Sequence, residues 1–281
     1  MARFVPDVGT HRWVLITPER GKRPHASITV EEGPKPSCVL CLPYQSPSPD
    51  MIEKYAIQEL FSLGEIKVIP NRFPITDIHE IIIHGPQDNQ DIESFPLTQV
   101  ENLLKTYRAR FQAHQRQGHV IIFNNRGYMA GGTLQHAHSQ LVVIPGQINL
   151  DELQLEPVAN VVDENNFFTV YCPDFSQWPY EVWVAPKKQK GPFSAISDDE
   201  IRDLAGLFQQ LVKVVLKKSN DLKNQEPNYN YYFYPGENWY LRLIPHFKHR
   251  GGLELGTGLA VNEKDPSVAA YELRNLLQPL S

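Results

Sequence analysis

The sequence has few of the features that mark secreted, membrane or nucleic-acid-binding proteins. Only 3 of its 281 residues are cysteines, too few for a disulfide framework. No run approaches the roughly 18 apolar residues of a membrane span, and the first residues lack the apolar core of a secretory signal. The net charge is −5 without a long basic block, which argues against a nucleic-acid partner. These absences lead us to expect a cytoplasmic protein.

The composition that is present fits a soluble protein with a substantial core. Hydrophobic residues make up 41% and charged residues 21% of the chain, as in ordinary globular domains. The length fits one large domain or two of ordinary size. The 23 prolines are scattered among apolar segments, which indicates ordered loops and not disorder.

A unit of strand, helix, strand, turn and strand occurs twice, with the copies about 100 residues apart. The first copy is predicted from a strand at 80–83, a helix over 97–115 and strands at 120–123 and 136–144. The second has a strand at 181–185, a helix that begins with a capping box from Ser197 to Glu200, and strands at 229–234 and 239–244. Two further strands are predicted at 12–16 and 66–69.

This repeat predicts an α+β fold of two duplicated half-domains with antiparallel sheets. We place the N-terminal half at 1–150 and the C-terminal half at 151–281. The copies differ where the first carries the histidine pair of 136–138, because the second has Asn238-Trp-Tyr240 there. Only the first half is therefore expected to carry a reaction centre.

The segment 131–143 is the most informative stretch of the first half. It runs Gly131-Gly132-Thr-Leu-Gln-His136-Ala-His138-Ser-Gln140 before an apolar run. In a strand, His136, His138 and Gln140 would share one face, and the glycines would let the backbone approach a ligand. Such a face suits a phosphate group. The spacing alone leaves a second interpretation open, a pair of surface histidines on an edge strand.

Phosphate transfer would assign distinct roles to two of these residues. A histidine can attack phosphorus with one ring nitrogen when a hydrogen bond fixes the other, and His138 is our candidate. Gln140 offers a neutral NH2 donor to a phosphoryl oxygen. A third histidine at that position could act as a general acid for water, whereas glutamine cannot, so the pattern favours transfer over hydrolysis.

The segment 123–140 resembles the active-site segment of the galactose-1-phosphate uridylyltransferase family, a branch of the histidine-triad superfamily. Other motifs match in the expected order, namely 13–24, Cys38-Val-Leu-Cys41, 70–74 and 179–181. The resemblance implies two histidine-triad-like halves. It also implies a double displacement in which His138 takes a nucleoside monophosphate from a nucleoside diphosphate hexose, leaving a nucleotidyl-histidine.

The family's best-known activity is exchange between UDP-glucose and a hexose 1-phosphate such as galactose 1-phosphate. The alternative is a phosphorylase in which inorganic phosphate accepts the nucleotidyl group from an ADP-sugar or a dinucleoside polyphosphate. A third hypothesis, from another class, is a non-catalytic nucleotide-binding protein, against which the intact His138 and Gln140 argue. The resemblance also implies a homodimer, in which residues of the C-terminal region reach the partner's site.

The resemblance assigns further residues to the substrate. These are Arg20 and Arg23 on phosphate or nucleotide, Asn71 on the base side, Asn125 and Thr133 as further contacts, and Gly127, Gly131 and Gly132 as points of close backbone approach. Arginine forks suit phosphate recognition. The Gly-rich stretch 251–258 is interpreted as another close-approach loop.

The resemblance also implies a structural zinc site. Cys38, Cys41 and His136 would supply three ligands, and Cys-x-x-Cys spacing suits a tetrahedral ion. Asp88 occupies the position of the family's fourth ligand, a histidine, and His79 and His84 are nearby alternatives. Cys172 has no partner in the sequence and is expected to be a buried core thiol.

Overall fold

The computed structural model describes residues 3–7, 12–18, 20, 38–150, 158–188, 191–221, 228–247 and 249–277. Within these ranges, none of the helices is long and apolar enough to cross a lipid bilayer.

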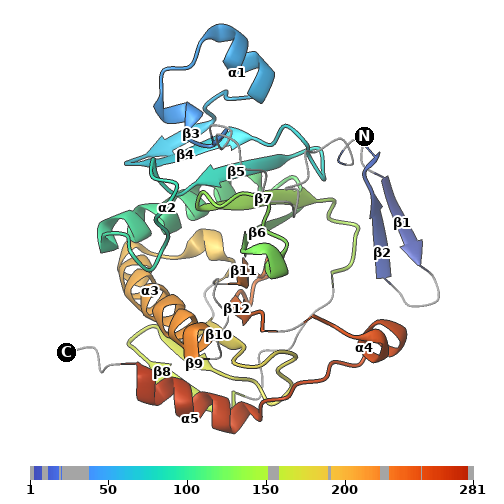
Figure 1. Cartoon of the computed structure of the whole chain (residues 1–281), viewed down its shortest axis with the longest axis vertical. Helices are drawn as coiled ribbons and strands as arrows, with labels where there is room; N and C mark the ends of the chain where they lie inside the picture. Colours follow the sequence, from blue (N-terminus) through green and yellow to red (C-terminus); the bar gives the residue numbers. More distant parts are fainter. Residues whose placement is uncertain are drawn as a thin grey trace, which may run out of the picture.

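One antiparallel sheet of ten strands runs through the described part of the molecule, in the order β3-β4-β5-β7-β6-β11-β12-β10-β9-β8 (Figure 1). The first half contributes β3 (Phe61–Leu63), β4 (Ile66–Pro70), β5 (His79–Ile83), β6 (His119–Arg126) and β7 (His138–Ile144). The second contributes β8 (Val161–Glu164), β9 (Phe168–Tyr171), β10 (Val182–Pro186), β11 (Tyr229–Phe233) and β12 (Leu241–Pro245).

The two predicted units are both present, and they share this single sheet. Each runs from a strand to a long helix and then to a pair of strands: β5, α2 (Leu97–His114), β6 and β7, followed by β10, α3 (Asp198–Asp221), β11 and β12. Antiparallel pairing of β6 with β11 joins them, with Asn125 opposite Asn230 and Phe123 opposite Tyr232. The α+β fold with antiparallel pairing is thus confirmed. The boundary at 150–151 stays a prediction.

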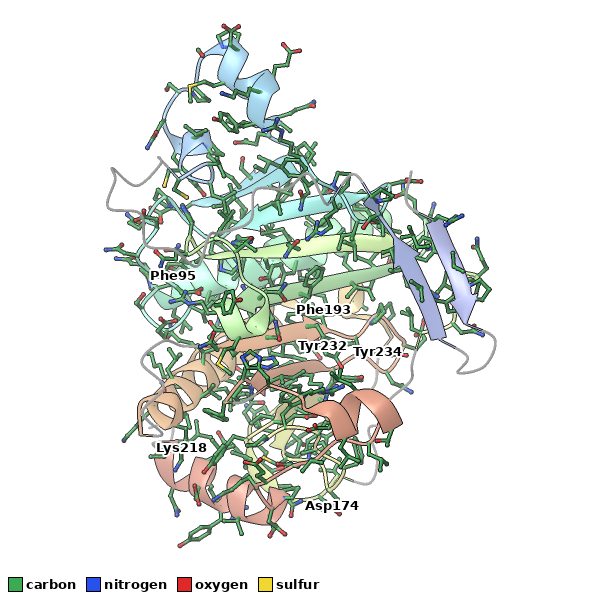
Figure 2. All side chains as sticks on the ribbon, turned by 45° about the vertical axis from the view of Figure 1, so that its right-hand side comes forward. Phe95, Asp174, Phe193, Lys218, Tyr232 and Tyr234 are labelled. Carbon is green, nitrogen blue, oxygen red and sulfur yellow. The ribbon has the colours of Figure 1, made fainter. Side chains whose placement is uncertain are left out.

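The long helices cover one face of the sheet. Helix α2 buries Val100, Leu103, Leu104, Tyr107 and Phe111, the predicted helical stripe, and α3 is amphipathic in the same way. Ser197 and Glu200 form the predicted capping box before α3, with Glu200 Oε2 accepting from the Ser197 amide at 2.8 Å. Phe193, labelled in Figure 2, packs against Phe233 in the same core. These two helices do not cover the opposite face of β5, β6 and β7.

Smaller elements surround the sheet. Strands β1 (Arg3–Asp7) and β2 (Arg12–Ile16, as predicted) form a separate hairpin, and helix α1 (Pro49–Tyr55) protrudes beyond β3 (Figure 1). Helix α5 (Pro266–Leu276) packs beside β8. The segment 251–258, expected to be a loop, instead contains the short helix α4 (Gly252–Thr257), which ends at Gly258 with φ +75°. The Glu254 side chain stabilises this turn by accepting from the Gly251 amide.

Candidate active site and metal centre

His138 is the first residue of β7, on the face opposite α2. Its Nδ1 lies 2.8 Å from the main-chain oxygen of His136. A carbonyl oxygen can only accept, so Nδ1 carries the proton and Nε2 keeps its lone pair. His138 is 6% exposed, and this burial lowers its pKa to about 4. The ring is therefore a neutral imidazole with a fixed tautomer, held by its own chain.

His136 does not belong to the strand, which corrects the predicted range of 136–144. Strand β7 begins at His138, so alternation places only His138 and Gln140 on one face. The His136 ring turns away from that pair, with Nε2 2.7 Å from the oxygen of Gly85. Since this oxygen must accept, the neutral ring presents the lone pair of Nδ1 on its other side.

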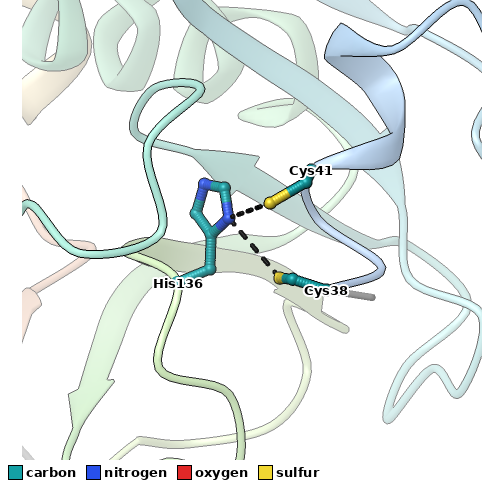
Figure 3. A group of neighbouring side chains, drawn as sticks. All are labelled: Cys38, Cys41 and His136. Carbon is teal, nitrogen blue, oxygen red and sulfur yellow. Dashed lines mark hydrogen bonds between the residues drawn. The ribbon is translucent and has the colours of Figure 1, made fainter. Parts of the chain in front are cut away.

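That lone pair faces both thiols of the Cys-x-x-Cys motif (Figure 3). His136 Nδ1 lies 3.5 Å from Cys38 Sγ and 3.4 Å from Cys41 Sγ. Bond lengths of about 2.3 Å for Zn–S and about 2.0 Å for Zn–N, at a tetrahedral angle, separate the two ligand atoms by about 3.5 Å. The three side chains thus fit three corners of a zinc tetrahedron. They also form the one group of this kind found among the described residues.

The expected fourth ligand is not part of this group. Asp88 is exposed and outside the cluster, although its charge contributes, after burial and the charge of Cys38, to the raised pKa of Cys41. The two alternative fourth ligands, His84 and His79, also lie outside the group. His84 lies against Asp91 and Ser139 on the helix side, and His79 contacts Gln140.

The loop that carries Cys38 and Cys41 packs on the same face of the sheet as His138. Leu40, between the two cysteines, is buried in a cluster with Ile69 of β4 and Ile83 of β5. Ile83 is the register partner of His138, so it shares that residue's face. Burial of Leu40 therefore anchors the cysteines beside the strand that carries His138.

The Gly-rich turn before β7 needs its glycines. Gly127 and Gly131 adopt φ values of +80° and +78°, which favour glycine. A Cβ on Gly132 would lie 2.7 Å from the oxygen of Asn125 and 2.9 Å from that of Gly127, and the Gly132 amide donates to the latter at 2.9 Å. The three glycines predicted as close-approach points thus form a tight turn, and Thr133 follows directly.

Residues of the second half hold this turn, and sequence reasoning missed them. Asn230 of β11 donates its side-chain NH2 to Asn125 Oδ1 at 2.8 Å and to the oxygen of Ala130 at 2.9 Å. Its Oδ1 accepts from His246 Nε2 at 2.5 Å. Asn125 is therefore aimed by its partner across the β6–β11 junction, and only knowledge of that strand pairing could have revealed the link.

Two further predicted residues, Arg20 and Asn71, lie around β4 and β5. Arg20 NH1 donates to the oxygen of Phe73 at 2.7 Å, and Asn71 Oδ1 accepts from the Phe73 amide at 2.8 Å. Arg20 and Asn71 thus meet at one loop, close to His79 (whose Nε2 is 3.0 Å from Asn71 Nδ2). Arg23 lies outside the described residues.

A buried chain of hydrogen bonds lies on the face of β7 that packs against α2. Tyr107 of α2 donates to Ser139 Oγ at 2.7 Å and lies 2.7 Å from the hydroxyl of Tyr231. Ser139 lies 3.1 Å from His84 Nε2, and His84 Nδ1 faces Asp91 Oδ1 at 3.4 Å. The carboxylate accepts, so the donors run in one direction from Tyr231 to Asp91. These polar groups are fully enclosed by the core and hold the strand; they do not meet solvent.

The chain is similar to several known proteins. A family model described as "Domain of unknown function (DUF4931) N-terminal domain" matches residues 46–146. ADP-glucose phosphorylase of Arabidopsis thaliana is 24% identical over 96% of this chain and 92% of its own length. Galactose-1-phosphate uridylyltransferase of Thermotoga maritima is 24% identical over 69% of this chain and 73% of its own. A crystal structure of an ADP-glucose phosphorylase from Arabidopsis thaliana with bound ADP-glucose superposes with a TM-score of 0.70 at 22% identity, covering 98% and 99% of the two chains.

The chain thus shares the fold of these solved structures, with mixed α and β structure and antiparallel pairing. Over most of its length the chain is similar to galactose-1-phosphate uridylyltransferases and to an ADP-glucose phosphorylase. The resemblance drawn from the motifs is confirmed, and these relatives are enzymes of the nucleotidyltransferase or phosphorylase type.

Proposed function

We propose that the protein transfers a nucleoside monophosphate from a nucleoside diphosphate hexose to a phosphate-bearing acceptor, with His138 as the covalent carrier. The observation that carries this proposal is the 2.8 Å hydrogen bond from His138 Nδ1 to the oxygen of His136. It fixes the tautomer in which Nε2 is the nucleophile.

The reaction has two displacements at the same phosphorus. His138 Nε2 attacks the α-phosphorus, an N–P bond forms, and the bond to the bridging oxygen breaks, so the hexose 1-phosphate leaves with the electron pair. A phosphate oxygen of the acceptor then attacks, the N–P bond breaks, and the neutral imidazole is restored. The Gln140 side-chain NH2 donates to a non-bridging oxygen on which negative charge builds up in each transition state.

Zinc would be held by Cys38, Cys41 and His136, and its role when bound is to fix His136 in place. The main-chain oxygen of His136 then orients the His138 ring.

The predicted contacts around the substrate belong to the same proposal: Arg20, Arg23 and Thr133 for phosphate, Asn71 on the base side, and Asn125 with Gly127, Gly131 and Gly132 along the nucleotide. Arginine side chains suit the negative charges of a diphosphate.

Two donor and acceptor pairs are the leading candidates. UDP-glucose with galactose 1-phosphate is the pair implied by the uridylyltransferase motifs and by relatives that span 69–75% of the chain. ADP-glucose with inorganic phosphate is favoured by the relative that spans 96% of the chain. Both use the same histidine chemistry and differ in the base and the acceptor.

A crossed assay tests the proposal. Each nucleotide sugar is incubated with galactose 1-phosphate or inorganic phosphate, and nucleotide products are separated by chromatography. We expect turnover for one donor with one acceptor, and its loss in His138→Asn. If no donor turns over with either acceptor and the nucleotide sugar still binds, the protein is a nucleotide-binding module and the transferase proposal is overturned.

A further inference from the structure

We propose that His79 positions Gln140, so that the Gln140 side chain presents its NH2 and not its oxygen to the phosphoryl group. This inference rests on the proposed function, because it assigns a role within the transfer step. The two side chains lie on neighbouring strands. Gln140 pairs with Ile81 in the β5–β7 register, and alternation puts His79 on the same face as Ile81.

The tautomer of His79 follows from its main-chain contact. The amide of Ile75 donates to His79 Nδ1 at 3.0 Å. A main-chain N–H cannot reverse its role, so Nδ1 accepts and the proton of the neutral ring is on Nε2. The loop 71–78, which returns the chain from β4 to β5, thereby decides which nitrogen of His79 is the donor.

That donor meets the oxygen of the Gln140 side chain. His79 Nε2 lies 3.0 Å from Gln140 Oε1, so an N–H to oxygen bond forms between them. The Phe73 amide donates to Asn71 Oδ1, so Asn71 Nδ2, which also lies 3.0 Å from His79 Nε2, is a donor and cannot accept the Nε2 proton. Gln140 Oε1 is the acceptor beside that proton. His79 and Gln140 are each 4% exposed, so water cannot readily replace either partner.

The bond selects one of two orientations of the Gln140 amide. With Oε1 turned toward His79, the NH2 group faces away from His79 and is the end available to a phosphoryl oxygen. Rotation of the amide by half a turn would place a further donor, beside Asn71 Nδ2, against the Nε2 proton of His79 and direct a carbonyl lone pair at the substrate. The first contact is unfavourable in a buried site, and the second would repel the negative charge that Gln140 is proposed to stabilise.

The test combines substitutions at both positions in a double-mutant cycle. His79→Phe keeps a flat ring and removes the donor; His79→Gln keeps a donor near the position of Nε2. The readouts are single-turnover formation of the labelled enzyme and the substrate Kd. We expect His79→Phe to slow the covalent step about 10- to 100-fold with little change in Kd, as for loss of a transition-state donor, and His79→Gln to restore most of that rate.

The same His79 substitution made in the Gln140→Ala variant distinguishes positioning of the Gln140 amide from a general structural effect of His79. There the orientation of the amide no longer matters, so His79→Phe should cause little additional slowing. Equal slowing by His79→Phe with and without Gln140 would overturn the inference, as would His79→Gln being as slow as His79→Phe while both melt like the parent chain. If instead Gln140→Ala and His138→Asn keep full activity, the failure lies in the proposed function itself.

Discussion

The Nδ1 nitrogen of His138 donates a 2.8 Å hydrogen bond to the main-chain oxygen of His136, whose own ring faces Cys38 and Cys41. The proposed nucleophile is thus oriented by the proposed metal ligand, two residues away. Each member of the His-x-His-x-Gln motif has a different task, although the spacing suggests three equivalent side chains. His136 joins the cysteine loop to the strand, His138 would attack, and Gln140 would donate to the phosphoryl group.

Loss of a cysteine ligand should lower both the zinc content and the rate of covalent labelling of His138. Cys41→Ser removes one of three ligands, so bound zinc should fall from about one per chain to a small fraction. Without the ion, His136 is less fixed, and covalent labelling of His138 should slow about 10- to 100-fold, the range found when metal-site supports are lost. Metal analysis by mass spectrometry and single-turnover labelling give the two values.

Cys172→Ala serves as the matched control, because Cys172 is a buried core thiol away from the metal group. It should leave the metal content unchanged. A metal-free wild-type chain that labels at full rate would contradict the role assigned to zinc.

The contact across the two halves should matter for nucleotide affinity. Asn230→Ala removes the donor that aims Asn125 and leaves the oxygen of Ala130 without that partner. The bond that aims Asn125 is worth about 1–1.5 kcal/mol, so its loss should weaken nucleotide-sugar binding about tenfold, measured by calorimetry. Asn275→Ala on the exposed side of α5 should leave affinity unaltered. Equal affinity in both variants would show that the Gly-rich turn is held without Asn230.

The buried chain behind β7 should contribute to stability. Tyr107→Phe deprives Ser139 of its donor and Tyr231 of its partner, and unsatisfied buried groups cost about 1–3 kcal/mol. We expect the free energy of unfolding in urea to fall by that amount. A variant as stable as the parent would mean that the two hydroxyls find other partners.

Helix α5 should become less firmly attached in acid. Glu272 accepts from Lys264, Tyr180 and Lys218, and these contacts lower its pKa to about 2. A depressed pKa stabilises the fold above the ordinary value of 4.5 and loses that contribution as pH falls toward 2. Glu272→Gln should therefore be less stable than the parent at pH 7, by roughly 1 kcal/mol for a partly exposed ion-pair group. Urea titrations at several pH values should show the gap closing between pH 5 and 2; a constant gap would point to packing and not charge.

The main elements of the fold were predictable because their patterns are local. The apolar stripe of 97–115 and the capping box at Ser197 identify the two long helices, and α2 ends within one residue of the prediction. Strand β2 was predicted with its observed bounds. The short strand β3 and the helix α4 were missed, because a three-residue strand has no measurable period and glycines within 251–258 suggest a loop.

The site was predictable where one motif contains the contacts, and less so where distant strands supply them. The spacing of Cys38 and Cys41 and the resemblance brought in His136, and these three side chains do converge. His79 was considered only as a zinc ligand, since its role depends on the β5–β7 register. Asn230 belongs to the second half and reaches Asn125 only through the β6–β11 pairing. Pairing between strands so far apart in sequence leaves no signal in either segment.

The most direct measurement traps the covalent intermediate. The chain is incubated with ADP-glucose or UDP-glucose labelled at the α-phosphorus and without acceptor, then denatured at neutral pH and digested for mass spectrometry. We predict an acid-labile nucleotidyl group on His138 that disappears when the productive acceptor is added. Turnover of a nucleotide sugar with no label on His138, or with undiminished activity in His138→Asn, would contradict the central claim.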